Sequence, residues 1–148
     1  NIISSGVTQV ATGRSHSCAL VNDILQCWGD NQSGQLGDGT TISKNKPVTI
    51  INSGTSRVAV GASHSCALVS GRLHCWGSNL LGELGNDLIF YGSKVPVLVN
   101  ISDVQDFAAG VNYSCAKSKS ELKCWGSNYL NQLGDGAGFR YRPLYHNE

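Results

Sequence analysis

The chain has no methionine and little charge. Charged residues make up 14% of its 148 residues, and 11 Lys and Arg balance 10 Asp and Glu, which gives a formal net charge of +1. Proteins that bind nucleic acid usually carry a basic stripe, and none occurs here, so we predict no nucleic-acid partner. Because neither an initiator methionine nor a signal peptide is visible, we expect a mature product or an excised piece.

Long apolar runs are also missing. No run approaches the roughly 20 residues that a membrane-spanning helix needs, so we predict no membrane insertion. No segment of helix length has an amphipathic pattern. We find no Ser/His/Asp arrangement, paired carboxylates or phosphate-binding loop that would indicate catalysis. The sequence therefore predicts a protein that is not an enzyme and holds no cofactor.

The chain instead consists of one unit repeated three times. The tripeptide Cys-Trp-Gly begins at Cys27, Cys75 and Cys124, at spacings of 48 and 49 residues. A repeat of about fifty residues that reads as strands is typical of propeller blades or a related array. We therefore predict one all-β domain over residues 1–148, built from three four-stranded propeller-type blades near 1–51, 52–101 and 102–148.

The cysteines fall into three pairs, each with eight residues between the partners. The residues between them read as two short strands around a polar turn. Such a hairpin places the partners in a non-hydrogen-bonded pair, with Cα atoms about 4.5 Å apart, within the range of a disulfide. The turn Lys119-Ser120 is less favourable than Ser70-Gly71, so the third hairpin has the least constrained register. The predicted disulfides, one per blade, are Cys18–Cys27, Cys66–Cys75 and Cys115–Cys124.

Metal binding is the alternative role for these cysteines. Structural zinc sites usually bring cysteines about two to four residues apart or combine Cys with His, so no metal site is predicted. The segment Asp30–Gly34 is similar to a calcium loop but lacks the distal Glu. Since disulfides persist in oxidising compartments, we predict an extracellular or periplasmic protein, either secreted or on the cell surface.

The three units share a specific frame that covers nearly the whole chain. From Gly13 it reads Gly-Arg-Ser-His-Ser-Cys-Ala-Leu, and from Cys27 it reads Cys-Trp-Gly-Asp-Asn-Gln-Ser-Gly-Gln-Leu-Gly-Asp-Gly-Thr, followed by Pro47-Val48. This frame resembles the repeat of the regulator of chromosome condensation family, most of all the cysteine-bearing version in secreted bacterial proteins and some plant receptor ectodomains. The resemblance implies a β-propeller of four-stranded blades.

The functions that this resemblance implies are varied. One nuclear member of the family is an exchange factor for the GTPase Ran and binds chromatin, and another member inhibits β-lactamase. No exchange-factor or inhibitor residues of those members can be carried over to this sequence. Full propellers of the family also have more than three blades, and three blades cannot close a ring.

The copies differ most in the segments after each Leu-Gly, and loops often carry binding on rigid scaffolds. Aromatic residues and Arg are enriched at binding hot spots. In and near these loops, such residues are Phe90, Tyr91, Tyr129, Phe139, Arg140, Tyr141 and Arg142. They predict a non-enzymatic extracellular module that binds a protein or glycan, and the alternative is that the rings pack over the next blade.

A self-assembling structural subunit is the alternative function. Three blades leave an open face and strand edge at each end, and unpaired edges invite pairing with another chain. The first blade offers the apolar residues Val7, Val10 and Ile24. The partner would then be a copy of the chain itself, in a closed ring or an extracellular filament.

Residues that recur in every unit are expected to be scaffold. His16 and His64 share one position, where the third unit has Tyr113, and we predict that they form structural hydrogen bonds. Strands that are apolar on both faces are covered on both sides. The tryptophans that should therefore be buried and equivalent are Trp28, Trp76 and Trp125. Because it carries charges where the other units are apolar, as at Lys117, the third unit is either a cap of the array or shows that this rim tolerates charge.

Three Asn residues lie in N-glycosylation sequons, at Asn31, Asn100 and Asn112. Asn100 is the favoured acceptor for a eukaryotic chain because it lies between two units. Asn31 belongs to the repeat frame, where its side chain is expected to shape a turn.

Overall fold

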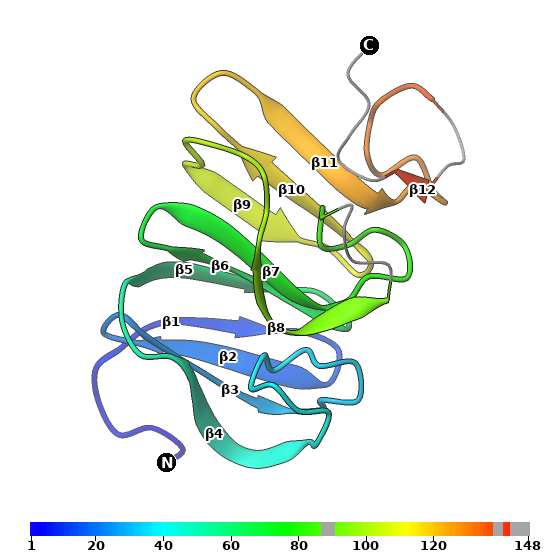
Figure 1. Ribbon diagram of the computed structural model, residues 1–148. Helices are drawn as coiled ribbons and strands as arrows, with labels where there is room; N and C mark the ends of the chain where they lie inside the picture. The colour runs from blue at the N-terminus through cyan, green and yellow to red at the C-terminus, as the bar shows by residue number, and fades with distance from the viewer. Residues whose placement is uncertain (87–90, 138–140, 143–148) are drawn as a thin grey trace.

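A computed structural model describes residues 1–86, 91–137 and 141–142 of the chain. These residues form three four-stranded antiparallel sheets that stack as blades (Figure 1). Strands and turns make up this part of the chain, and it contains no helix that is long and apolar enough to cross a membrane. The prediction of an all-β chain with propeller-type blades is confirmed.

Each blade is a chain-order meander. The first consists of β1 (Val7–Thr12), β2 (His16–Val21), β3 (Ile24–Gly29) and β4 (Lys44–Ile51). The second consists of β5 (Thr55–Val60), β6 (His64–Val69), β7 (Arg72–Ser78) and β8 (Gly92–Leu98). The third consists of β9 (Asp106–Ala109), β10 (Tyr113–Lys117), β11 (Leu122–Ser127) and β12 (Tyr141–Arg142).

The central hairpin of each blade is closed by a disulfide. The cysteines stand directly opposite each other in the register of β2 with β3, β6 with β7, and β10 with β11. Their Cα atoms lie 4.1, 4.0 and 4.0 Å apart in the three blades. The prediction of one disulfide per blade is therefore confirmed.

The turns of these hairpins differ. Asn22 and Ser70 adopt positive φ angles of 60° and 48°, as tight two-residue turns between β strands require. In the third blade the pairing ends at Lys117 and Leu122, and the loop between them closes with a 2.8 Å hydrogen bond from Ser118 N to Glu121 O. The strand pairing thus ends one residue pair earlier than in the first blade, while the number of residues in the hairpin and the cysteine register are unchanged.

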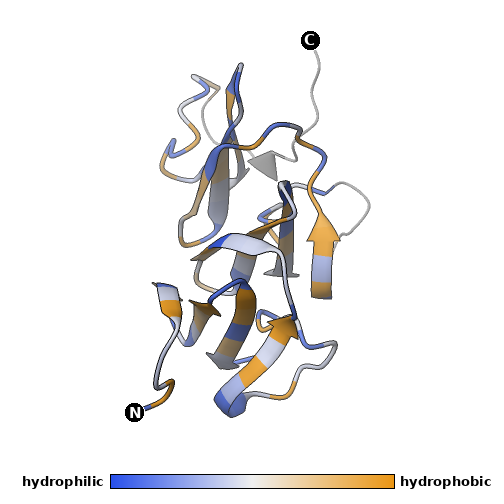
Figure 2. Cartoon of the chain, turned by 90° about the vertical axis from the view of Figure 1, so that its left-hand side faces the viewer, coloured by the Kyte–Doolittle hydropathy of each residue, from blue (hydrophilic) through white to orange (hydrophobic). Residues whose placement is uncertain are grey.

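The hydrophobic core lies between neighbouring blades. Figure 2 shows apolar residues, in orange, distributed along the strands of the stacked blades. One cluster joins the disulfide face of the first blade to the opposite face of the second, and its buried residues are Cys18, Leu20, Leu25, Cys27, Leu36, Val58, Val60, Ala67 and Trp76. A second cluster joins the next pair of blades, through Cys66, Leu68, Leu73, Cys75, Leu84, Val99, Val104, Phe107, Ala116 and Trp125. Each blade therefore packs its disulfide face on the tryptophan face of the next.

The three tryptophans are not equivalent, so that expectation was wrong. Trp76 and Trp125 have no exposed surface, whereas Trp28 is only partly buried. The reason is position in the array, because no blade of the structure covers the face on which Trp28 lies. The disulfides differ in burial as well. Cys115 and Cys124, in the third blade, are partly exposed, whereas the other four cysteines are buried.

Candidate interaction surfaces

An asparagine of the repeat frame shapes the loop that follows each Cys-Trp-Gly. Asn31 is fully buried, its Oδ1 accepts from Leu36 N at 3.0 Å, and its Nδ2 donates to Asp38 Oδ1 at 3.0 Å and to Thr40 O at 3.1 Å. Asn79 accepts from Leu84 N at 2.9 Å in the same way. The loop is therefore fixed from within its own blade.

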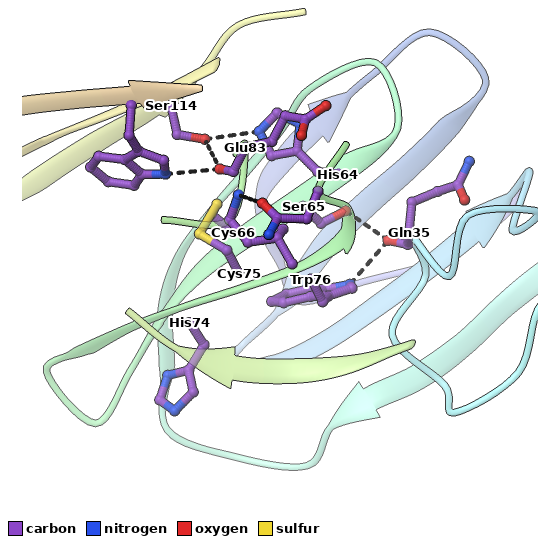
Figure 3. Close-up of a disulfide and its surroundings, with 12 residues drawn as sticks. Gln35, His64, Ser65, Cys66, His74, Cys75, Trp76, Glu83 and Ser114 are labelled. Carbon is purple, nitrogen blue, oxygen red and sulfur yellow. Dashed lines mark hydrogen bonds between the residues drawn. A yellow bond between two sulfur atoms is a disulfide. The ribbon is translucent and has the colours of Figure 1, made fainter. Parts of the chain in front are cut away.

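This loop connects the first blade to the second through one backbone carbonyl. Gln35 O accepts hydrogen bonds from Ser65 Oγ at 2.7 Å and from Trp76 Nε1 at 3.0 Å (Figure 3). Gly37 lies so close to the indole that a Cβ atom there would be 2.6 Å from Trp76 Nε1. The Leu-Gly of the repeat frame is thus explained by close packing against the next blade.

We call this contact between the loop of one blade and the next blade a joint. The joint between the second and third blades repeats the joint between the first and second. Glu83 O accepts from Ser114 Oγ at 3.0 Å and from Trp125 Nε1 at 2.8 Å. The same three chemical groups, a loop carbonyl, a serine hydroxyl and an indole N–H, therefore hold both pairs of blades together. The joint is a property of the repeat and not of one site.

A buried histidine completes each joint. His64 Nε2 lies 2.9 Å from Ser114 Oγ (Figure 3). His16 Nε2 lies 2.8 Å from Ser65 Oγ in the same way. Because each hydroxyl gives its hydrogen to a carbonyl, it must accept from the imidazole, so Nε2 carries the hydrogen. Burial lowers the pKa of both histidines to about 4; the charge of Asp30 partly opposes this for His16. The histidines are neutral scaffold groups, as predicted.

Apolar side chains are exposed in the loops of the second and third blades. The side chains of Leu80, Tyr91, Tyr129 and Leu130 are 71%, 86%, 48% and 86% exposed. Sequence reasoning named the two tyrosines and missed the two leucines. The signal was present in the repeat alignment, because the first unit has the polar pair Gln32-Ser33 where the third has Tyr129-Leu130.

The structure describes the remaining predicted partner-binding residues only in part. Phe90, Phe139 and Arg140 lie outside the described residues. Tyr141 and Arg142 form β12, whose backbone pairs with Ser127 and Gly126 of β11.

The three sequons differ in accessibility. Asn100 is exposed, Asn112 is partly buried, and Asn31 is fully buried with its amide nitrogen hydrogen-bonded. A glycan on Asn31 is incompatible with this fold, because the amide that would carry it holds the loop together. Glycosylation of Asn100 stays a prediction.

Two sequence profiles match this chain. The profile of the regulator of chromosome condensation (RCC1) repeat matches residues 25–68 and 70–116, and a second RCC1 repeat profile matches residues 7–35. The chain belongs to the RCC1 repeat family. Each of the two regions matched by the first profile includes the loop that provides the accepting carbonyl, Gln35 or Glu83, and the strand of the next blade that provides the serine, Ser65 or Ser114. Each region therefore contains most of one joint.

Solved structures agree with this assignment of the fold. Yeast RCC1 (Prp20) bound to Kap60 is 23% identical with a TM-score of 0.78, over 96% of this chain and 37% of that one. Human WBSCR16 is 23% identical with a TM-score of 0.73, over 82% of this chain and 33% of that one. The ectodomain of the Physcomitrella patens receptor kinase CR4 is 21% identical with a TM-score of 0.56, over 88% and 33%.

The chain spans about a third of the length of these proteins, 33% to 37%. No curated protein matches it by sequence. At these identities the likeness shows the fold, and a fold by itself does not fix a function.

Proposed function

We propose that the chain is a non-enzymatic RCC1-repeat module that binds a protein partner outside the reducing interior of the cell. The observation that carries the proposal is the exposure of four large apolar side chains, Leu80, Tyr91, Tyr129 and Leu130, in loops of the second and third blades. Loops on a rigid scaffold often carry binding, and exposed apolar and aromatic side chains there are candidate contact residues.

The loops that carry Leu80 and Leu130 are held in place before any partner binds. Leu81 N donates to Glu83 Oε2 at 2.8 Å, and Leu130 N donates to Gln132 Oε1 at 2.8 Å. A preordered loop loses little conformational entropy on binding, which favours affinity. Yeast RCC1, a structural neighbour, is bound to the protein Kap60, which supports a protein as the class of partner.

The disulfides support an extracellular or periplasmic location. All six cysteines are paired and none is free. Such pairs are stable where the surroundings are oxidising and are rare in the cytosol.

The test uses the residues of the first blade as a guide. The variant Leu80→Gln, Leu130→Ser gives the exposed loops of the second and third blades residues that the first blade has at these positions. The immobilised wild-type chain should retain a specific protein from the secreted fraction of its source, and this variant should lose it. The control Gln32→Ala, in the exposed loop of the first blade, should retain it. Equal retention by all three chains would reject the proposed surface.

A further inference from the structure

The first blade presents the donors of a joint without an acceptor. Trp28 and Ser17 are the equivalents of Trp76 and Ser65, and both are partly exposed. In the second blade the matching indole and hydroxyl donate to Gln35 O. Among the described residues nothing accepts from the Trp28 indole or the Ser17 hydroxyl. This face therefore has the chemistry of a joint whose other half lies elsewhere.

The joint between the first and second blades shows which segment packs against such a face. Residues 34–39 of the first blade lie against the start of β8: Gly39 N donates to Lys94 O at 2.9 Å, and a Cβ on Gly34 would be 2.9 Å from Lys94 Cα. The occupant is thus the loop that carries the accepting carbonyl.

The corresponding place on the first blade is an open pocket. Gly29 pairs with Lys44 at the start of β4, and Gly77 pairs with Ser93 at the start of β8. The start of β4 in the first blade is therefore equivalent to the start of β8, against which the loop of the first blade lies. A pocket of about 450 Å³ lies there. Its lining residues are Gly29, Ser43, Lys44, Asn45, Lys46 and Val48.

The third blade carries the matching loop in a preformed shape. Leu133 N donates to Asn128 Oδ1 at 3.0 Å, as Leu36 N does to Asn31 Oδ1. Leu133 and Gln132 are partly exposed. Their equivalents, which are covered by a following blade, are all buried: Gln35, Leu36, Glu83 and Leu84.

We propose that these two halves join two copies of this chain, head to tail. The carbonyl of Gln132 in one copy accepts hydrogen bonds from Trp28 Nε1 and Ser17 Oγ of the next copy, and its loop fills the pocket beside β4. A second copy is the occupant because this chain itself carries both halves of the joint, in the geometry that its two internal joints repeat. The contact is heterologous, so it builds rings or filaments and not a symmetric pair of identical patches.

The surrounding faces are suited to this contact. Val10 on the first blade and Leu122 on the third are 62% and 70% exposed, and each lies on the face that would be covered. Lys117 occupies a leucine position of the third blade, but its ammonium donates to Gln105 Oε1 at 3.1 Å within its own blade. The phenol of Tyr113, in the histidine position, can supply the donor that Ser17 Oγ lacks.

A pair of glycine variants tests the joint. At the internal joint a Cβ on Gly37 would be 2.6 Å from the Trp76 indole, whereas one on Gly39 would be 3.9 Å from Val95. Their equivalents Gly134 and Gly136 have φ angles of +68° and +70°, and a Cβ on either would lie more than 4 Å from every atom of the described residues. Asn tolerates such angles, so Gly134→Asn and Gly136→Asn place equal strain on the fold, but only the first blocks the joint.

Multi-angle light scattering across a hundredfold concentration series, on the oxidised chain, gives the answer. The wild type and Gly136→Asn should rise above the single-chain mass of 15.7 kDa with concentration, and Gly134→Asn should associate at least about tenfold more weakly. A wild type that stays at this mass throughout, or two variants that behave alike, would overturn the proposal.

Mixing separates a head-to-tail joint from any other contact. Gly134→Asn retains an intact first-blade face, and Trp28→Ala retains an intact third-blade loop. Each should be monomeric alone, and an equimolar mixture should form a complex of two chains that grows no further. Absence of this complex from two folded variants would contradict the proposal, and the glycine pair decides it if Trp28→Ala does not fold.

Discussion

At the scale of single residues, the buried histidines make the joints between blades sensitive to acid. His16 and His64 have pKa values of about 4 in the folded chain, below the ordinary 6.5, because burial disfavours the imidazolium. A protonated imidazole would add a hydrogen at Nδ1, and His16 Nδ1 has no hydrogen-bond partner in the described chain. Protonation therefore opposes the folded state.

The sign of the pH dependence follows from this. Between pH 6.5 and about 4 the unfolded chain binds protons at these histidines that the folded chain does not, so stability is complete above this window and falls as the pH falls through it. Each unit of pKa difference corresponds to about 1.4 kcal/mol per histidine. Urea unfolding near neutral pH and at mildly acidic pH measures the loss, which we expect to reach a few kcal/mol.

A control for this prediction is His64→Gln, whose amide can donate to Ser114 Oγ without titrating. This variant should have a shallower pH dependence than the wild type. Glu83 acts in the opposite direction, because burial raises its pKa and its contribution is lost as the pH rises. The variant Glu83→Gln should therefore steepen the net loss of stability in acid, and an unchanged slope in both variants would contradict the assignment.

The tryptophans provide the second prediction at this scale. Trp76→Ala should lower the free energy of unfolding by about 3–5 kcal/mol, the usual range for removing a fully buried aromatic ring. Trp28→Ala should cost clearly less in a monomeric chain, since this ring is partly exposed. Chemical denaturation of both variants in the Gly134→Asn background compares them without association. Equal losses would mean that the first-blade face is covered in solution.

At the scale of secondary structure, the hairpins show why part of the fold was predictable. An equal number of residues between paired cysteines and a period-two pattern fix the register, so the pairing of Cys115 with Cys124 followed even where Lys119-Ser120 made a poor turn. The turn of the third hairpin depends instead on Ser118 Oγ, which accepts from Ser120 N and Glu121 N. Such local side-chain bonds are set by atomic geometry that a residue pattern does not contain.

The contacts between neighbouring blades could not be predicted from the sequence. The repeat frame predicted that His16 and His64 are scaffold, but not that their Nε2 atoms reach into the following blade. Trp28 and Trp76 have the same local sequence and differ in burial because burial depends on the neighbouring blade. The fold class could be read from each unit alone, whereas the open joint depends on the order of the units.

The disulfides provide a prediction at this scale. Cys115 and Cys124 are partly exposed, and the cysteines of the first two blades are buried, so a reductant should reach the third disulfide first. Limited reduction at low protein concentration, followed by alkylation and peptide mapping, should label the third pair before the others. Simultaneous labelling of all three pairs would show that reduction requires global unfolding instead.

At the scale of the whole molecule, the described residues form an array in which the second blade packs against a blade on each of its two faces, and the first and third blades pack against a blade on one face each. In a repeat array, stability is approximately the sum of the blades and of the contacts between neighbours. Blade two takes part in both core clusters, whereas the first and third blades take part in one each. We therefore expect the second blade to be the most protected part of the chain.

Hydrogen exchange followed by mass spectrometry tests this gradient. In dilute solution the amides of β6 and β7 should exchange most slowly, and those of β2, β3, β10 and β11 should exchange faster, because the outer blades can open without disrupting both cores. At high concentration the head-to-tail joint adds a neighbour to each outer blade, so β2, β3, β10 and β11 should slow. The Gly134→Asn chain keeps the same fold but lacks the joint, so its exchange should not depend on concentration. If exchange in the wild-type chain is equally independent of concentration, the gradient between the blades would stand. The head-to-tail contact with a second copy would then be contradicted.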